Sequence, residues 1–150
     1  MDTLIDPVTE LSRVVGRFRR QLRRSAGRSF DAARLSESQS ELLWLVGRRP
    51  GISVSAAADE LGLVANTAST LVSKLVARGL LIKTASETDR RVGRLRLAGA
   101  AQQVVDSSRT ARRAVLAEVL EEFDDDQIHY LAQGLTVLDT LTQRLQERRQ

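Results

Sequence analysis

The chain has 150 residues, of which 42% are apolar and 28% are charged. This length and balance suit one folded domain with its own core, and they argue against collagen-like, disordered and membrane-embedded classes. The chain has no cysteine and only one histidine, His129, so we expect no disulfide, no metal site and no cofactor held by such groups. It also lacks a signal peptide and an apolar run of about 20 residues, from which we expect a cytoplasmic protein.

Positive charge gathers in one part of the sequence. The net charge is +4, and all 23 basic residues except Lys74 and Lys83 are arginine. Arginine suits bidentate contacts to phosphate and base edges, although a GC-rich genome also enriches arginine without any such partner. Residues 62–98 hold seven basic and two acidic residues, whereas residues 118–126 hold six acidic residues and no basic one. The first segment is therefore the candidate for contact with an anionic polymer.

The first half of the chain carries helix signals. Asp6-Pro7 predicts the start of a helix that runs to about Gly27, with one apolar face. That face consists of Val8, Leu11, Val14 or Val15, Phe18 and Leu22. The arginine run at 13–28 is most simply a solvated helix face, with a ligand-carboxylate site and a phosphate contact as alternatives.

Three shorter helices are predicted next. A capping box at Ser36 to Gln39 opens the first, Ser53 caps a second that ends at Gly62, and a third runs from about Ala65 to Arg78. Beyond Gly79 the pattern changes to short strands at 80–82 and 94–97, joined by a loop over 84–93.

Two long helices are predicted to close the chain. The first begins near Ala100, and its apolar positions are Val104, Ser108, Ala111, Val115, Val119 and Phe123. A capping box at Asp124 and Gln127, with a staple between Phe123 and Ile128, opens the second. Leucines at 131, 135, 138, 141 and 145 form its apolar stripe.

Two short helices, a glycine turn and a hairpin form the plan of a winged helix-turn-helix. Small polar side chains at the start of the helix after Gly62 can enter a major groove about 12 Å wide, and Ser73 and Lys74 are placed to reach phosphate. The recognition-helix candidates are Ala65, Asn66, Thr67, Ser69, Thr70, Ser73 and Lys74. The arginine-rich hairpin can enter the narrower minor groove.

Three segments carry a family resemblance. They are Leu61-Gly62-Leu63, the run from Leu71 to Leu81, and Glu87-Thr88-Asp89-Arg90-Arg91 leading into Arg94-Leu95-Arg96-Leu97. In this order, between one long helix and two long closing helices, the sequence resembles the MarR family of bacterial transcription regulators over most of its length. The resemblance implies a mainly α fold with a small β-hairpin. The winged helix-turn-helix spans about 36–98, and long dimerisation helices flank it at about 5–34 and 99–147.

The resemblance also implies a function. We expect a homodimer that binds a pseudo-palindromic operator in double-stranded DNA, with recognition helices about 34–36 Å apart. A small aromatic or phenolic ligand would release such a repressor by favouring another spacing. In the wing, Asp89 matches the acidic residue that pairs with an arginine, and Arg90, Arg91 and Arg94 are candidate DNA contacts. The ligand-pocket candidates are Arg17, Phe18, Phe30 and Trp44, although Trp44 also suits a core position.

The sequence departs from the family pattern at two positions of the recognition helix. Val64 stands where a capping residue is common, so the helix is capped by Asn66 or by no side chain. Thr70 stands where many members have arginine, which would shift the weight of DNA binding to the wing. Weak polar readout keeps one alternative open, a winged-helix module that binds a protein rather than specific DNA. No nucleophile with a base and no phosphate-binding glycine loop is present, so we expect no enzyme activity.

Overall fold

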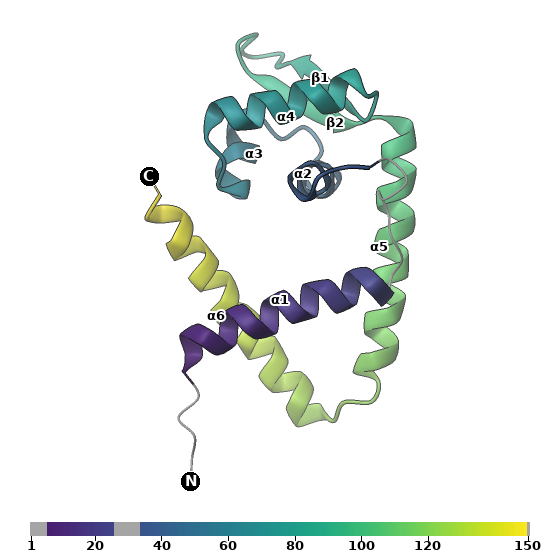
Figure 1. The fold of residues 1–150 in the computed structure, drawn as a ribbon, viewed down its shortest axis with the longest axis vertical. Coiled ribbons are helices and arrows are strands. Elements are labelled where there is room, and N and C mark those ends of the chain that lie inside the picture. The colour runs from purple at the N-terminus through teal and green to yellow at the C-terminus, as the bar shows by residue number, and fades with distance from the viewer. Residues whose placement is uncertain (1–5, 26–33, 150) are drawn as a thin grey trace.

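The computed structural model describes residues 6–25 and 34–149. In these residues the chain forms six α-helices and one two-stranded antiparallel hairpin (Figure 1). The elements in chain order are α1 (Pro7–Ser25), α2 (Glu37–Arg48), α3 (Val54–Leu61), α4 (Ala65–Ala77), β1 (Leu81–Ala85), β2 (Gly93–Leu97), α5 (Gly99–Leu120) and α6 (Asp125–Glu147). The expected fold class, mainly helical with a small hairpin in winged-helix order, is confirmed.

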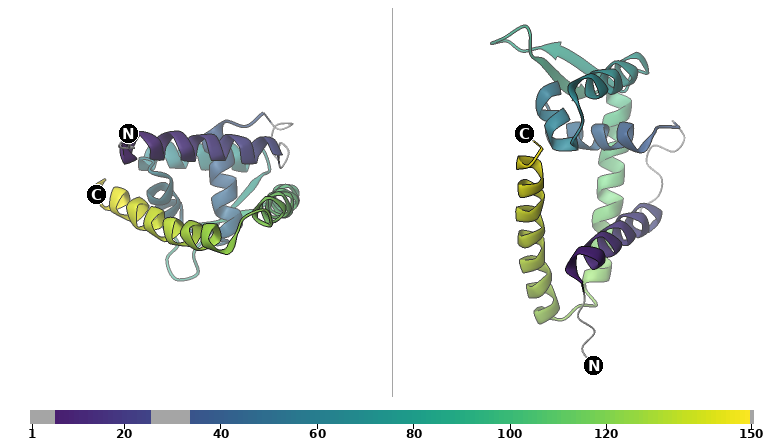
Figure 2. Two further views of the ribbon diagram at one scale, coloured as in Figure 1. Left: turned by 90° about the horizontal axis from the view of Figure 1, so that it is seen from below. Right: turned by 60° about the vertical axis from the view of Figure 1, so that its left-hand side comes forward.

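The short and long helices occupy different parts of the molecule. Helices α2, α3 and α4 pack with the hairpin in the upper part of Figure 1, and we call this part the winged module (residues 36–98). Helix α5 leads away from it, and α1 contacts α5 below it. Helix α6 turns back from the end of α5, so that its last residues lie close to α3 (Figures 1 and 2).

The core of the winged module is built around α2. Four residues on one face of α2 are buried: Leu42, Leu43, Leu45 and Val46. They cluster with apolar residues from every other element of the module and from α5, namely Ile52, Ala57, Val72, Leu75, Leu81, Leu95, Ala101 and Val105. Because burying one such side chain contributes about 1.5–3 kcal/mol, this cluster fixes α4 and the hairpin on α2.

Helices α2 and α5 approach each other closely at Gly47. A Cβ atom on this residue would lie 2.8 Å from Val105 Cγ1 and 3.2 Å from Leu97 Cδ1. Arg109 of α5 also donates a hydrogen bond to the carbonyl oxygen of Gly47 at 3.2 Å. The absence of a side chain at Gly47 therefore lets α5 dock on the module.

The hairpin is joined on one side by the chain that links α2 to α3. The backbone N–H of Gly51 donates to the carbonyl oxygen of Leu95 at 2.8 Å. The backbone N–H of Leu95 donates to the carbonyl oxygen of Ile52 at 2.9 Å. Ser53 forms an isolated bridge with Arg94. The wing is thus attached to the start of α3 by backbone hydrogen bonds.

The helix boundaries in the middle of the chain follow its capping signals. Ser36 and Gln39 form the expected capping box of α2, and Asp124 and Gln127 form that of α6. The Ser53 side chain accepts from the N–H of Ala56 at the start of α3. These predictions are confirmed, because each cap satisfies an amide that has no partner inside its helix.

Helix α1 begins at its predicted cap. The carboxylate of Asp6 accepts hydrogen bonds from the hydroxyl of Thr9 and from the backbone N–H groups of Val8 and Thr9. These bonds hold the pKa of Asp6 below its usual range, and the bond from the Thr9 hydroxyl has the largest effect. The predicted end of this helix near Gly27 lies outside the described residues.

One prediction for the second half of the chain is corrected, and another is extended. The loop predicted at 84–93 covers only 86–92, because Thr84 and Ala85 pair with Arg94 and Gly93 in the sheet. The buried residues of α5 are Ala101, Val105 and Ser108, whereas Val104 is only half-buried. Ser108 is buried as predicted, and Ala101 and Val105 extend the inward face of α5, with Val105 next to Gly47.

The apolar faces of α1 and α6 are exposed. Among the described residues neither helix has a buried side chain. On α1, Val8 is 77% and Phe18 is 52% exposed, and Leu131, Leu135, Leu141 and Leu145 are exposed on α6. Phe123 and Ile128, predicted to form a staple, are exposed too. Within residues 6–25 and 34–149, no helix is long and apolar enough to cross a membrane.

Candidate nucleic-acid interface

Helix α4 presents a continuous polar face to solvent. Its buried residues Ala68, Val72 and Leu75 follow the helical period and hold one face on the core. The other face carries all the residues predicted for the recognition helix, and each of them is exposed: Ala65, Asn66, Thr67, Ser69, Thr70, Ser73 and Lys74. This arrangement leaves small donors and acceptors on one helix, as readout of base edges requires.

The first turn of α4 has little side-chain support. Val64 occupies the N-cap position without a capping hydrogen bond and is 70% exposed. Of the two alternatives that the sequence left open, a cap by Asn66 or by no side chain, the second holds: within residues 6–25 and 34–149 no side chain caps α4. The Thr70 hydroxyl donates to the carbonyl oxygen of Asn66 at 2.9 Å, so its hydrogen is already used within the helix.

The wing loop is shaped by Asp89. Its carboxylate accepts from the backbone N–H of Arg91 at 3.0 Å, and its carbonyl oxygen accepts from the N–H of Val92 at 3.0 Å. The pairing of Asp89 with an arginine side chain, expected from the resemblance, is not found in the part of the chain that the structure describes. The carboxylate is turned toward the loop backbone instead, as short acidic side chains in turns commonly are.

The wing arginines fall into two groups. Arg90 and Arg91 are exposed at the loop, which extends away from the body of the winged module (Figure 2). Arg94 lies back on β2, and its guanidinium donates to the carbonyl oxygen of Gly51 at 3.4 Å. Arg90 and Arg91 are therefore available to a partner beyond the loop, whereas Arg94 is directed toward the link between α2 and α3.

Opposite charges lie at opposite ends of α5. The acidic residues at 118–126 surround the turn between α5 and α6, at the bottom of Figure 1, and the exposed ones begin at Glu118. The basic residues of α4 and the wing lie at the top. An anionic polymer is thus attracted to the winged module and repelled from the far end of the molecule.

The ligand-pocket candidates that the structure describes lie on two helices, α1 and α2. Arg17 and Phe18 are exposed on α1, Trp44 is half-buried against the core cluster on α2, and Phe30 lies outside the described residues. The Trp44 ring is covered by Arg112 of α5, whose guanidinium carbon is 4.2 Å from the ring centre. The Nε atom of Arg112 is buried and has no hydrogen-bond partner among the described residues.

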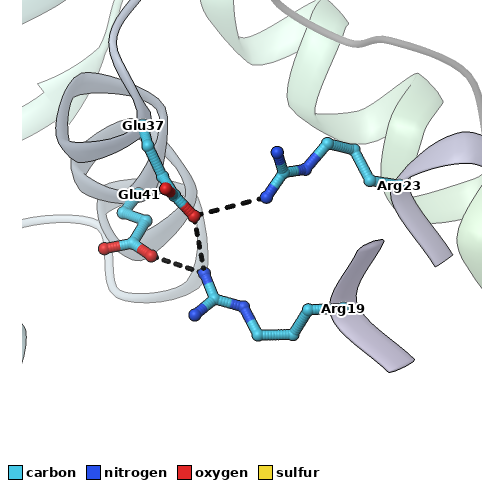
Figure 3. Close-up of polar contacts among 4 residues, drawn as sticks. All are labelled: Arg19, Arg23, Glu37 and Glu41. Carbon is cyan, nitrogen blue, oxygen red and sulfur yellow. Dashed lines mark hydrogen bonds and ion pairs between the residues drawn. The ribbon is translucent and has the colours of Figure 1, made fainter. Parts of the chain in front are cut away.

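Arginines of α1 form ion pairs with glutamates of α2 near the contact between Arg112 and Trp44. Arg19 lies 2.5 Å from Glu41 and 3.4 Å from Glu37, and Arg23 lies 3.3 Å from Glu37 (Figure 3). Burial, followed by the charges of Arg23 and Arg19, lowers the pKa of Arg112. Arg19 and Arg23 are therefore paired with the two carboxylates, whereas Arg112 lies over the Trp44 ring and is subject to the charges of both arginines.

Sequence reasoning missed the role of these residues. Arg19 and Arg23 are one helical turn apart, as are Glu37 and Glu41, and this matched spacing was the available signal. Arg19 and Arg23 are exposed, as a solvated helix face requires, and the structure adds their ion pairs with α2. Arg112 follows Ser108 by four residues, so it continues the inward face of α5 as a basic residue.

No cluster of ligating side chains accompanies these contacts. Among residues 6–25 and 34–149 there is no group of three or more histidine, cysteine, aspartate or glutamate residues that could hold a metal ion.

Comparisons with known proteins agree with this geometry. Residues 35–92 match the sequence model of the MarR family; this segment covers α2, α3, α4, β1 and the wing loop and ends before β2. The resemblance drawn from the sequence is thereby confirmed. No curated protein matches the sequence significantly.

Solved structures share the fold over most of the chain. A MarR transcriptional regulator from Methanosarcina mazei superposes with a TM-score of 0.69 at 18% identity, covering 91% of this chain and 99% of that one. RV1404 from Mycobacterium tuberculosis gives 0.70 at 20% identity, with 94% and 95% covered. Streptococcus pneumoniae FabT, solved in complex with DNA, gives 0.68 at 22% identity, with 74% and 78% covered. At these identities the likeness concerns the fold.

Proposed function

Given that the chain has the fold of MarR-family transcriptional regulators, we propose that it is a cytoplasmic repressor that binds a specific DNA operator. The observation that carries the proposal is the shared exposure of the α4 polar face and of the wing arginines Arg90 and Arg91. Helix α4 enters the major groove, and the wing reaches the adjacent minor groove or its phosphates. That FabT was solved with DNA supports this partner. No catalytic role is part of the proposal.

The active form is a homodimer. The exposed apolar stripes of α1 and α6 support this, since monomeric proteins rarely leave such a surface uncovered. A second copy that covers both stripes would present two winged modules to the two halves of a pseudo-palindromic operator.

A small aromatic anion releases the repressor. The support is the excess of positive charge at Arg19, Arg23 and Arg112, next to the Trp44 ring. A carboxylate or phenolate there would accept a hydrogen bond from Arg112 and would compete with Glu37 and Glu41 for the arginines of α1. Because these ion pairs join α1 to the winged module, their exchange would change the spacing of the recognition helices.

DNA binding is tested by fluorescence anisotropy with duplex from the region upstream of the protein's own gene. The titration is done with excess unrelated duplex and at two salt concentrations. We expect saturation at one dimer per inverted repeat, with a log–log salt slope of about −0.9 per phosphate contacted. The double variant Arg90→Ala/Arg91→Ala should lose most of the affinity, whereas Arg113→Ala/Arg148→Ala, matched in charge, should keep it.

Other outcomes of this titration would refute the proposal. Binding that unrelated duplex abolishes equally would leave a protein with general affinity for DNA. Absence of binding at both salt concentrations would favour the alternative, a winged-helix module that binds a protein partner.

The ligand proposal has its own measurement. Trp44 is the only tryptophan of the chain, so its fluorescence reports directly on the site. Benzoate should change the Trp44 emission of the wild-type protein and weaken its operator binding, and it should do neither with Arg112→Met. An equal response of the variant would show that the anion binds elsewhere.

A further inference from the structure

The residues at and just after the end of α6 contact α3 and the turn between α3 and α4. The Nη1 group of Arg149 donates a hydrogen bond to the carbonyl oxygen of Gly62 at 3.1 Å. Three residues earlier, Gln146 Nε2 lies 3.5 Å from Glu60 Oε2 of α3. These contacts border a cleft of about 510 Å³ between α3 and α6. A long helix outside the winged module thus reaches the helix-turn-helix directly.

Gly62 leaves the room that this contact needs. It ends α3 in the left-handed conformation, with φ of 64°. A Cβ atom on Gly62 would overlap Nη1 of Arg149, so any side chain there would displace the guanidinium. Turn geometry and the reach of Arg149 therefore both require glycine at this position.

The start of α4 depends on few other contacts. From α3, the carbonyl oxygen of Ala58 accepts the backbone N–H of Leu63 at 2.9 Å. Val64 has no capping hydrogen bond and is exposed, so the N-cap side chain does not hold the first amides of α4. Arg149 approaches this turn from outside the winged module.

We infer that Arg149 is a positioning residue, which sets the first turn of the recognition helix and couples it to α6. The inference rests on the proposed DNA binding, because the residues it positions are the proposed contacts Asn66 and Thr67. Since α6 also carries the stripe that a second copy would cover, a shift of α6 is passed to Gly62 and from there to α4. Arg149 itself does not touch DNA.

The test uses three variants of the full chain. Arg149→Ala removes the bond to Gly62, Arg149→Lys keeps a donor, and Arg148→Ala removes an equal charge from the neighbouring exposed position. Loss of one such hydrogen bond predicts operator binding weaker by about twofold to tenfold for Arg149→Ala. We expect Arg148→Ala to bind as the wild type does and Arg149→Lys to recover much of the loss.

Two further readouts separate positioning from other effects. The salt slope of operator binding should be unchanged in Arg149→Ala, because a residue that contacts phosphate would lower it by about one. Hydrogen exchange in the DNA-free protein should become faster at the hydrogen-bonded amides of Leu63 and Ala68 in Arg149→Ala and not in Arg148→Ala.

Each contrary result would overturn the inference. A reduced salt slope would make Arg149 a phosphate contact, and an equal loss in Arg148→Ala would make the effect one of charge alone. Unchanged exchange at Leu63 and Ala68 would show that Arg149 does not hold the turn. If the wild-type protein binds no operator, the proposed function fails and the coupling to DNA binding with it, while the exchange data still report on the turn itself.

Discussion

Arg112 of α5 lies over the ring of Trp44 of α2, with its guanidinium carbon 4.2 Å from the ring centre. This cation–π contact joins a long helix to the central helix of the winged module. It sits where Arg19 and Arg23 of α1 also meet α2, so all three helices converge at one point. The position of the winged module on the long helices is therefore decided partly by charge.

Replacing Arg112 by alanine should loosen this junction. We expect the free energy of unfolding to fall by about 1 kcal/mol, the scale of a partly buried cation–π contact. The Trp44 emission should shift to longer wavelength, because the ring loses its cover. Urea denaturation at fixed protein concentration, followed by Trp44 fluorescence, measures both. Arg113→Ala is the control, since Arg113 is exposed on the same helix. An equal loss in the control would contradict the role given to Arg112.

Operator binding should depend more on the wing than on Thr70. The Thr70 hydroxyl donates its hydrogen bond to the carbonyl oxygen of Asn66, whereas Arg91 is exposed on a loop shaped by Asp89. We expect Arg91→Ala to weaken binding by about 1 kcal/mol or more and Thr70→Ala to weaken it less. Anisotropy titrations of the two variants under one salt condition provide the comparison. The reverse ranking would show that α4 dominates readout.

A charge in the exposed stripe of α6 should prevent association of two copies. Leu135 is 56% exposed in the single chain, and glutamate there would have to lose its hydration if a second copy covered it. We expect Leu135→Glu to be a folded monomer by sedimentation velocity and circular dichroism. Gln133→Glu, on another face of α6, should keep the wild-type mass. A wild-type protein that sediments as a monomer would argue against the proposed dimer.

Adding a methyl group at Gly47 should push α5 away from the winged module. The new Cβ would be 2.8 Å from Val105 Cγ1, closer than packed carbon atoms lie, so Gly47→Ala should cost about 1–3 kcal/mol of stability. Gly99→Ala is the matched control, because nothing lies within 4 Å of the atom added there. Thermal and chemical denaturation of the pair measure the difference. Equal stability of the two variants would show that α5 shifts without cost.

Local sequence patterns predicted the elements well. Capping boxes at Ser36 and Asp124 and the glycine at 62 act within one or two turns of the chain, so their effect can be recognised without any tertiary contact. The alternation at Arg94 to Leu97 predicted a strand for the same reason. The strand ends were set too short, because Thr84 and Ala85 depend on partners across the hairpin rather than on their own propensity.

The candidate site also has a part that follows from local sequence and a part that depends on tertiary contacts. The sequence by itself determined which residues α4 and the wing loop expose, because helical period and turn composition fix the outward positions. Tertiary structure alone decided that Arg112 covers Trp44, that Arg19 and Arg23 reach Glu37 and Glu41, and that Arg149 reaches Gly62. Those contacts join residues far apart in the chain. They form only because the packing of other side chains determines where α1, α5 and α6 lie.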